Sequence, residues 1–325
     1  MIANFIKTVI RLTAILGLTA LTAISARAQD YPSKPITFVV GFSAGGFADS
    51  VGRILAQGVS DQLGQPVVVE NRGGAAGNVA AGSVAASAGD GYTVLVTTAS
   101  LGLSQSTRKE LPYDIKDLTA VAIPASSPET LAAHPSVPAN NLAELIAWAK
   151  TQPSVTLGNA GIGTGSQVTT AFFLTKLAGL DNIKQIGYKG GSKARQAAIS
   201  GEVQLIGSSN SVYPVIREGL LKGLAVASVN QHDAIPNVET FEEQGYDRFV
   251  VSSWVGLFVP SNTPADIQEK LNLAVNEMLQ QTETQEKFKK AGVLTHERDL
   301  NASKQFFATD TKNWSNMVYA LGIGN

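Results

Sequence analysis

The sequence predicts an α/β fold made of two α/β lobes that are joined by two hinge segments, with a ligand cleft between the lobes. Three observations predict it. Strand-like and helix-like segments alternate in two sets, one before residue 118 and one after residue 142. A stretch rich in proline separates the sets, and a long β-like run at 249–259 returns the chain to the first set. Such alternation is typical of parallel sheets covered by helices.

The first set begins with the β-branched run at 36–40, which lies between Pro35 and a glycine-rich turn. Apolar residues at helical spacing follow over 48–63, and Gly64 is placed to end that helix. The other elements that we expect in this set are a strand at 67–69, a helix at 79–88 and a strand at 92–98.

The stretch 118–138 alternates short apolar pieces with prolines, and we expect it to cross between the lobes. The second set then has helices at 142–151, 167–178 and 193–200, strands at 155–158, 203–207 and 224–227, and a further strand that ends at Tyr188. Helices at 264–281, 283–291 and 303–320 complete the chain. We therefore expect residues 29–125 and 255–325 to form lobe 1 and residues 126–254 to form lobe 2.

The first 28 residues have the order of a secretory signal peptide. Lys7 and Arg11 precede an apolar run at 12–24, and Ala26, Arg27 and Ala28 form a small-residue cleavage site. The run is shorter than the roughly 20 residues that a membrane-spanning helix needs. We expect cleavage after Ala28 and a protein located in the periplasm.

Composition argues against several function classes. Removal of residues 1–28 takes away three basic residues and no acid, so 25 basic and 26 acidic residues become 22 and 26, a net charge of −4. Nucleic-acid binding requires clustered positive charge, so we expect no nucleic-acid partner. The chain has no cysteine, and its three histidines (His134, His232 and His296) are dispersed. We therefore expect no metal and no cofactor.

Two glycine-rich loops, one in each set, stand between a strand and a helix. The first contains Phe42, Ser43, Gly45 and Gly46, and the second contains Gly163, Thr164 and Ser166. Unpaired N–H groups and the helix dipole make a helix N-terminus a binding site for anions. Because both lobes carry such a loop, the sequence predicts a cleft that holds a carboxylate from two sides.

Other polar residues are placed to reach the same cleft. Ser208, Ser209 and Asn210 follow a strand of the second set. Asp49 begins the first helix, where it either accepts hydrogen bonds from backbone N–H groups or contacts the ligand. Trp254 lies in an apolar run, which favours a place in the core over contact with a ligand.

Residues 41–45 also match the G-x-S-x-G pattern of a serine hydrolase (GFSAG), in which Ser43 would be the nucleophile. That pattern needs an oxyanion hole from a loop after an earlier strand. Here the motif follows the first strand, and only seven residues separate that strand from the expected cleavage site, so the position of the motif argues against catalysis.

The chain resembles the substrate-binding proteins of tripartite tricarboxylate transporters, the TctC or Bug family. The resemblance spans nearly the whole chain after residue 28 and is carried by residues 31–36 (YPSKPI), 44–49, 63–72 (LGQPVVVENR), 74–78, 90–93 (DGYT), 111–114 (LPYD), 135–138 (PSVP), 188–190 (YKG), 252–260 and 263–264. It implies a periplasmic-binding-protein-like fold whose partner is a pair of membrane permease subunits.

The resemblance also implies which residues hold the carboxylate. They are Phe42, Ser43, Gly45, Gly46, Asp49, Gly163, Thr164 and Ser166, with Thr98 and Ser100 at the end of the third strand. The sequence departs from the family pattern at Gly41, at Phe47–Ala48 and at Gly207–Ser208–Ser209, which leaves the distal group of the ligand open. Phe42, Phe47 and the uncharged serines favour a ligand with an apolar or aromatic body.

We conclude from the sequence that the chain is a monomeric periplasmic solute-binding receptor without catalytic activity. It would capture a small organic carboxylate by lobe closure and deliver it to a tripartite tricarboxylate-type transporter. Two alternatives stay open: a serine hydrolase that uses Ser43, and a ligand sensor that docks a membrane histidine kinase. The sequence does not identify the carboxylate.

Overall fold

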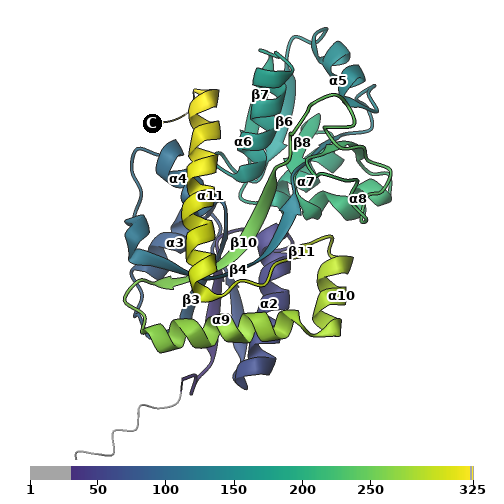
Figure 1. The fold of residues 1–325 in the computed structure, drawn as a ribbon. Helices are drawn as coiled ribbons and strands as arrows, with labels where there is room; N and C mark the ends of the chain where they lie inside the picture. Colours follow the sequence, from purple (N-terminus) through teal and green to yellow (C-terminus); the bar gives the residue numbers. More distant parts are fainter. Residues whose placement is uncertain (1–30, 323, 325) are drawn as a thin grey trace, which may run out of the picture. The chain divides into compact units, whose positions relative to one another are not determined.

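The protein is described by a computed structural model that covers residues 31–322 and 324. The expected signal peptide at 1–28 lies outside the described residues. The unit that begins at Pro35 contains two sheets, each mixed in strand direction and each covered by helices (Figure 1). This confirms the predicted fold class of two α/β lobes.

The first sheet has the strand order β11-β4-β10-β3-β1-β2. Its strands are β1 (Ile36–Val40), β2 (Val67–Asn71), β3 (Thr93–Thr98), β4 (Leu118–Pro128), β10 (Ser252–Pro260) and β11 (Leu294–Thr295). β1 is parallel to β2 and β3, as the alternation of strands and helices predicts. β10 is antiparallel to both β3 and β4 and so returns the chain into the middle of this sheet.

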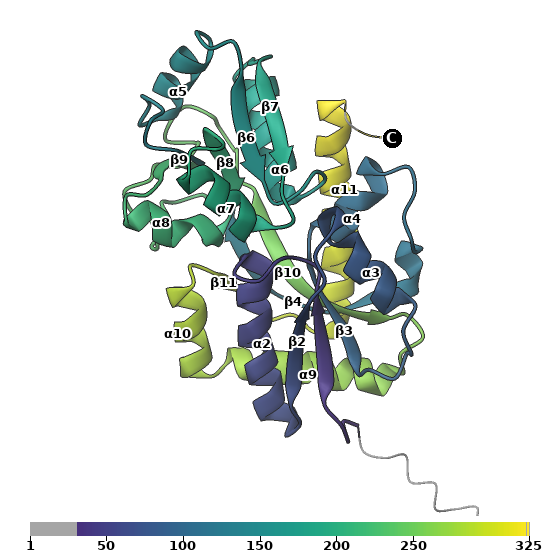
Figure 2. The same ribbon diagram turned by 180° about the vertical axis from the view of Figure 1, so that it is seen from behind.

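Helices cover both faces of the first sheet (Figures 1 and 2). They are α2 (Phe47–Leu63), α3 (Asn78–Ala85), α4 (Ser100–Thr107), α9 (Ala265–Leu279), α10 (Thr282–Lys290) and α11 (Leu300–Leu321). Val39 and Leu95 belong to the core cluster under α3, α4 and α11. Their neighbours Val40 and Val96 face the opposite way, towards Gly52 of α2. This alternation is expected for strands that are buried on both faces.

Helix α2 ends where the sequence predicts. Its C-cap, Gly64, adopts the left-handed conformation with a φ of 66°, and its N–H donates to the carbonyl of Ser60. Glycine is favoured here because it has no Cβ to clash in that conformation. None of the helices in the described part of the chain combines the length and apolar character that a membrane-spanning helix requires.

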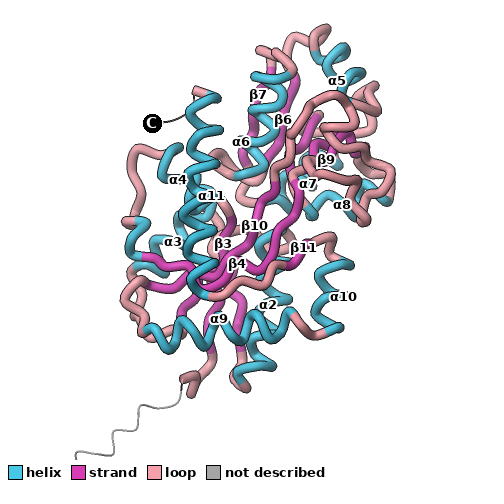
Figure 3. Tube along the Cα trace, viewed as in Figure 1, coloured by secondary structure: helices cyan, strands magenta, loops and turns pink. Residues whose placement is uncertain are grey.

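The second sheet has the strand order β7-β6-β8-β5-β9. Its strands are β5 (Thr130–Ala133), β6 (Val155–Asn159), β7 (Ile183–Gly187), β8 (Leu205–Ser208) and β9 (Lys222–Val226). The helices beside it are α5 (Leu142–Ala149), α6 (Gly165–Phe172), α7 (Gly191–Ile199) and α8 (Tyr213–Arg217) (Figure 3). Leu131 and Ala132 enter different core clusters, so both faces of this sheet are buried.

Two segments connect the sheets. The first passes from β4 to β5 through Glu129, and the second leads from β9 to β10 and enters the first sheet after Val251. The two segments are hydrogen-bonded to each other, because Glu129 N donates to Val251 O at 2.9 Å and Val251 N donates to Ala227 O at 3.0 Å. Residues 118–138 therefore cross between the sheets as two regular strands rather than as the short pieces that the prolines indicate.

Candidate functional site

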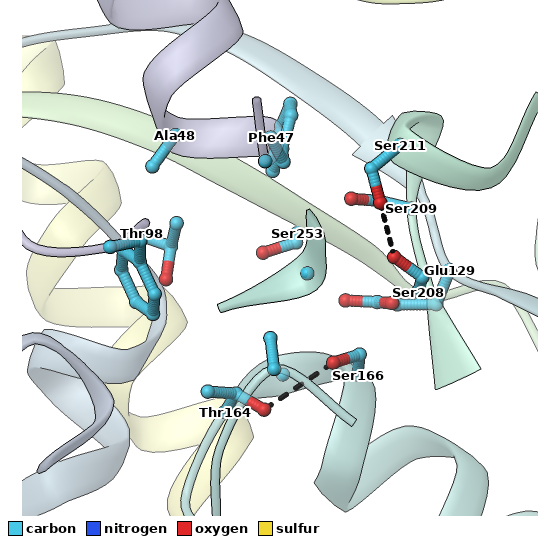
Figure 4. A pocket seen from close by; sticks show the side chains of 15 residues that line it. Phe47, Ala48, Thr98, Glu129, Thr164, Ser166, Ser208, Ser209, Ser211 and Ser253 are labelled. Atoms are coloured by element: carbon cyan, nitrogen blue, oxygen red, sulfur yellow. Dashed lines mark hydrogen bonds between the residues drawn. The ribbon is translucent and has the colours of Figure 1, made fainter. Parts of the chain in front are cut away.

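A cavity of about 40 Å³ lies where strands of both sheets end (Figure 4). One water molecule needs roughly 10–15 Å³ of such space, so this cavity can hold more than one. It is lined by Phe42, Gly46, Phe47, Ala48, Thr98, Glu129, Ala160, Thr164, Gly165, Ser166, Gly191, Ser208, Ser209, Ser211 and Ser253. Several of these residues end or follow β1, β3, β6 and β8, and the carboxyl ends of strands are where α/β sheets place ligands.

Three helices begin at the cavity wall. Helix α2 starts at Phe47, α6 at Gly165 and α7 at Gly191, and all three residues line the cavity. The residues before α2 and α7 are Gly46 and Gly190, which have no side chain with which to cap the first-turn N–H groups. Unpaired N–H groups and three positive dipole ends therefore favour an anion at this place.

Hydroxyl groups supply most of the remaining polar surface. Thr164 Oγ1 lies 3.3 Å from Ser166 Oγ, and Ser208 Oγ lies 2.7 Å from Ser211 Oγ (Figure 4). Thr98 Oγ1 is 2.9 Å from the hydroxyl of Ser100. Each hydroxyl can donate or accept a hydrogen bond, so this wall can adapt to different ligand groups.

Glu129 is the one acidic residue among the cavity-lining residues. Its side chain is 1% exposed, and burial raises its pKa to about 8. An ionised carboxylate loses its hydration when it is buried, so burial favours the protonated form of Glu129. Among the described residues, none of those that line the cavity is a lysine, an arginine or a histidine.

The loops on the two sides of the cavity contact each other directly. Ser43 Oγ lies 2.9 Å from Ser192 Oγ, and the Ser192 hydroxyl donates to the carbonyl of Ala44 at 2.8 Å. Ser43 N also donates to the carbonyl of Lys189 at 3.2 Å. These hydrogen bonds join the loop after β1 to the start of α7, so the cavity is closed on this side.

The predicted site residues fall into two groups. Seven of them line the cavity: Phe42, Gly46, Thr98, Thr164, Ser166, Ser208 and Ser209. The other six, which do not line it, are Ser43, Gly45, Asp49, Ser100, Gly163 and Asn210. Each residue of the second group forms a hydrogen bond with another residue of the protein. For example, Gly163 N donates to Gln167 Oε1, and Asn210 Nδ2 donates to the carbonyl of Ala291.

Asp49 holds the first loop in place. Its Oδ2 accepts from Gly45 N at 2.8 Å and from Arg53 Nε at 3.1 Å, and its Oδ1 accepts from Asn71 Nδ2 at 2.9 Å. Burial alone would raise the pKa of Asp49, but the hydrogen bonds from Arg53, Gly45 and Asn71 outweigh it and lower the pKa. The carboxylate is therefore ionised and fully engaged with the protein, which favours the structural role over ligand contact.

The predicted site residues did not include Glu129, Gly191, Ser211 or Ser253, which all line this cavity. Gly191 begins α7, and the sequence gives only the pair Gly190–Gly191 after a predicted strand as its signal. Ser253 lies in β10 and reads as part of an apolar strand. Glu129 could have been found, because an acid that stands between a proline and an apolar run in a crossing segment needs a reason to be buried.

Comparison with known proteins adds the family. Residues 51–323 match the sequence profile described as "Tripartite tricarboxylate transporter family receptor". The chain is 33% identical over 320 residues to protein BugT of Bordetella pertussis, a match that covers 96% of this chain and 98% of that protein.

Solved structures agree with this family. The periplasmic binding protein BugD is 30% identical, with a TM-score of 0.86, and the match covers 90% of this chain and 99% of BugD. MatC from Rhodopseudomonas palustris with bound malate is 29% identical, with a TM-score of 0.83, and the match covers 89% of this chain and 100% of MatC.

Proposed function

Because the chain belongs to the tripartite tricarboxylate transporter receptor family, we propose that its cavity captures a small organic carboxylate for delivery to a transporter of that type. The observation that carries this proposal is the convergence of the N-termini of α2, α6 and α7 on one cavity. Membership of a receptor family favours this function over the hydrolase and the kinase-docking sensor. The malate in MatC supports a carboxylate ligand here.

The ligand would be bound between the two lobes as they close around it. We assign residues 29–125 and 255–325 to lobe 1 and residues 126–254 to lobe 2, with the pivot near Glu129 and Val251, whose backbones are hydrogen-bonded. A ligand drives such closure only through a higher affinity for the closed form than for the open form. The backbone N–H donors of α2 lie on one lobe and those of α6 and α7 lie on the other. An anion can therefore accept hydrogen bonds from all three helices only in the closed form.

We propose further that the chain has no catalytic activity. Ser43 Oγ is engaged with Ser192, and the histidines that could activate it are hydrogen-bonded elsewhere. His134 pairs with Ser136, His296 pairs with Ser126, and His232 Nδ1 accepts from Ala234 N. A serine nucleophile needs an adjacent base, so this arrangement supports binding rather than hydrolysis.

Three finer assignments complete the proposal. The signal peptide is removed after Ala28, which releases the protein into the periplasm. The receptor acts as a monomer and presents its closed, liganded form to the permease subunits. The ligand has an apolar or aromatic body, since Phe42 and Phe47 line the cavity beside the hydroxyl groups.

A thermal-shift screen over mono-, di- and tricarboxylates and aromatic acids tests this function. A ligand at 100 times its Kd stabilises the folded state by about 2.7 kcal/mol, which raises the Tm measurably. We expect at least one carboxylate to raise the Tm, and matched esters or amides without the negative charge to have no effect. The proposal fails if no carboxylate shifts the Tm, or if the protein hydrolyses esters and Ser43→Ala abolishes that turnover.

A further inference from the structure

Glu129 lines the cavity from one of the two segments that connect the sheets. It stands between β4 and β5, where the two segments that connect the sheets are hydrogen-bonded. Its N–H donates to Val251 O at 2.9 Å, and its carbonyl accepts from Ala227 N at 2.8 Å. The backbone is thus fixed from both sides, and the side chain lines the cavity beside Ser208 and Ser211 (Figure 4).

The carboxyl group of Glu129 lacks a partner that would justify its burial. Its Oε2 is buried and has no hydrogen-bond partner among the described residues. A Cβ atom at Gly165 would come within 3.2 Å of Oε1, so glycine at that position leaves room for the carboxyl group. Buried carboxylates are normally paired or hydrogen-bonded, because desolvation otherwise disfavours them.

The cavity therefore has one region that favours negative charge and another that favours positive charge. The N-termini of α2, α6 and α7 favour negative charge, each carrying roughly half a positive charge. Glu129 is the one acidic side chain among the described residues that line the cavity, and once it ionises its carboxylate can pair with a positive charge or accept from a hydrogen-bond donor. A ligand with one carboxylate and one protonated amine would satisfy both ends.

We propose that Glu129 is a specificity-determining residue that binds a cationic nitrogen, and that the cargo is a small zwitterionic amino-carboxylate. This inference rests on the proposed function, since the carboxylate end is held as described above. A dicarboxylate such as the malate of MatC would bring a second anion towards Glu129, and it would fit this cavity only with Glu129 protonated.

Protonation gives the proposal a second observable. Burial raises the pKa of Glu129 to about 8, so the free receptor holds a proton there at pH 7. A cation beside the carboxyl group favours its ionised form, and binding therefore releases that proton. Among the described residues, Tyr213 of α8 is a titratable group whose pKa responds to the charge of Glu129. Burial, with a smaller contribution from the charge of Glu129, raises the pKa of Tyr213 to about 12, so it stays neutral.

Calorimetry with matched ligands tests the proposal. The probes are 4-aminobutyrate against butyrate, β-alanine against propionate, and 4-(aminomethyl)benzoate against 4-methylbenzoate, with succinate as the dicarboxylate. We expect the wild-type protein to prefer the aminated member of at least one pair by tenfold or more. Glu129→Gln, which keeps the shape and removes the charge, should erase this preference and leave the plain carboxylate bound as tightly or more tightly. Glu218→Gln, on the exposed surface of the same lobe, is the control and should retain it.

The proton measurement uses the same titrations at pH 7 in phosphate and in Tris, whose ionisation enthalpies differ. Binding of the amino-carboxylate should release close to one proton per ligand, and this release should vanish in Glu129→Gln. If that variant does not fold, the wild-type protein alone tests the role of Glu129, through its preference for the aminated ligand and its release of a proton on binding. Equal or tighter binding of plain carboxylates, without proton release, would overturn the role of Glu129 and leave the receptor function intact. If neither class binds, the proposed function itself fails.

Discussion

At the scale of single residues, the anion-binding loop depends on a side chain that does not line the cavity. Asp49 is 3% exposed and connects Gly45, Arg53 and Asn71. Asn71 Nδ2 in turn donates to the carbonyl of Phe42 at 3.0 Å. Through these bonds Asp49 fixes the loop in the conformation that directs the first N–H groups of α2 into the cavity. Its contribution to binding is therefore indirect.

Replacing Asp49 should cost stability. In Asp49→Ala the N–H of Gly45 and the amide of Asn71 lose their acceptor, so we expect the free energy of unfolding to fall by about 2 kcal/mol in urea titrations at pH 7. Asp61→Asn, on the exposed face of the same helix, is the control and should change stability little.

The pH dependence of this loss has a definite sign. Because the pKa of Asp49 is lower in the folded protein than its ordinary value of 3.8, its ionised form stabilises the fold above that value. This contribution disappears as the pH falls from about 3.8 through the folded-state pKa. The difference between the wild-type protein and Asp49→Ala should therefore shrink in that range. A constant difference would show that the carboxylate charge is not what matters.

At the scale of elements, helix α11 packs on the first sheet through a cluster of aromatic side chains and a hydrogen bond to a buried acidic residue. Trp254 of β10 packs edge-to-face on Phe307 and also contacts Phe258. Its Nε1 donates to Asp310 Oδ2 on α11. The prediction that Trp254 belongs to the core rather than to the ligand site agrees with its 2% exposure and its place in the core cluster.

Asp310 offers a test of this attachment. Burial raises the pKa of Asp310 more than the indole hydrogen bonds and the charge of Arg298 lower it. Ionisation of Asp310 therefore lowers the free energy of unfolding as the pH rises above the ordinary pKa of 3.8. Asp310→Asn keeps an acceptor for Trp254 and has no charge to desolvate, so we expect unchanged or greater stability at pH 7 and a smaller advantage at pH 4.5.

The matched variant separates the acceptor from the charge. Asp310→Ala removes the acceptor and leaves a buried indole N–H unpaired, which should lower the free energy of unfolding by about 1–3 kcal/mol. Urea unfolding of both variants at the two pH values measures these effects. If Asp310→Asn is as unstable as Asp310→Ala at pH 7, the ionised carboxylate is required and this account of the attachment is wrong.

Elements whose own residues carry a strong pattern could be predicted, and elements that depend on neighbours could not. The helix predicted at 48–63 forms at Phe47–Leu63, because its apolar spacing and Gly64 both lie in the local sequence. Helix α4 was missed, since Ser100–Thr107 is rich in serine and has no clear apolar stripe. Its stability comes from tertiary contacts. Ser104 Oγ accepts from Asn78, and Ser106 hydrogen-bonds Ser315 of α11.

At the scale of the whole molecule, the site exists only because distant segments meet. The two glycine-rich loops could be found in the sequence, since each follows a strand and opens a helix. The contact of Ser43 with Ser192 joins residues 149 positions apart, and no local pattern predicts it. Glu129 becomes part of the site for the same reason, because its neighbours in the cavity come from other segments of the chain.

Closure depends on how closely the loops approach, and Gly190 sets that distance. Gly190 has a φ of 138°, and a Cβ atom there would lie 2.9 Å from Ser43 N and would also clash with the Ser43 hydroxyl. In the closed form a methyl group at this position would push the two loops apart. In an open form it would meet no such obstacle, apart from roughly 1–3 kcal/mol of backbone strain.

Gly190→Ala should therefore fold but fail to close. We expect its affinity for the acid that gives the largest thermal shift to fall more than tenfold, and small-angle X-ray scattering to show no compaction when that acid is added. Gly179→Ala is the matched control, because Gly179 also has a positive φ, 65°, but nothing lies within 4 Å of its added Cβ. That variant should lose some stability and still bind and compact. If Gly190→Ala compacts as the wild-type protein does, the ligand-bound form does not bring Gly190 against Ser43, and the closed cavity described here is not the binding state.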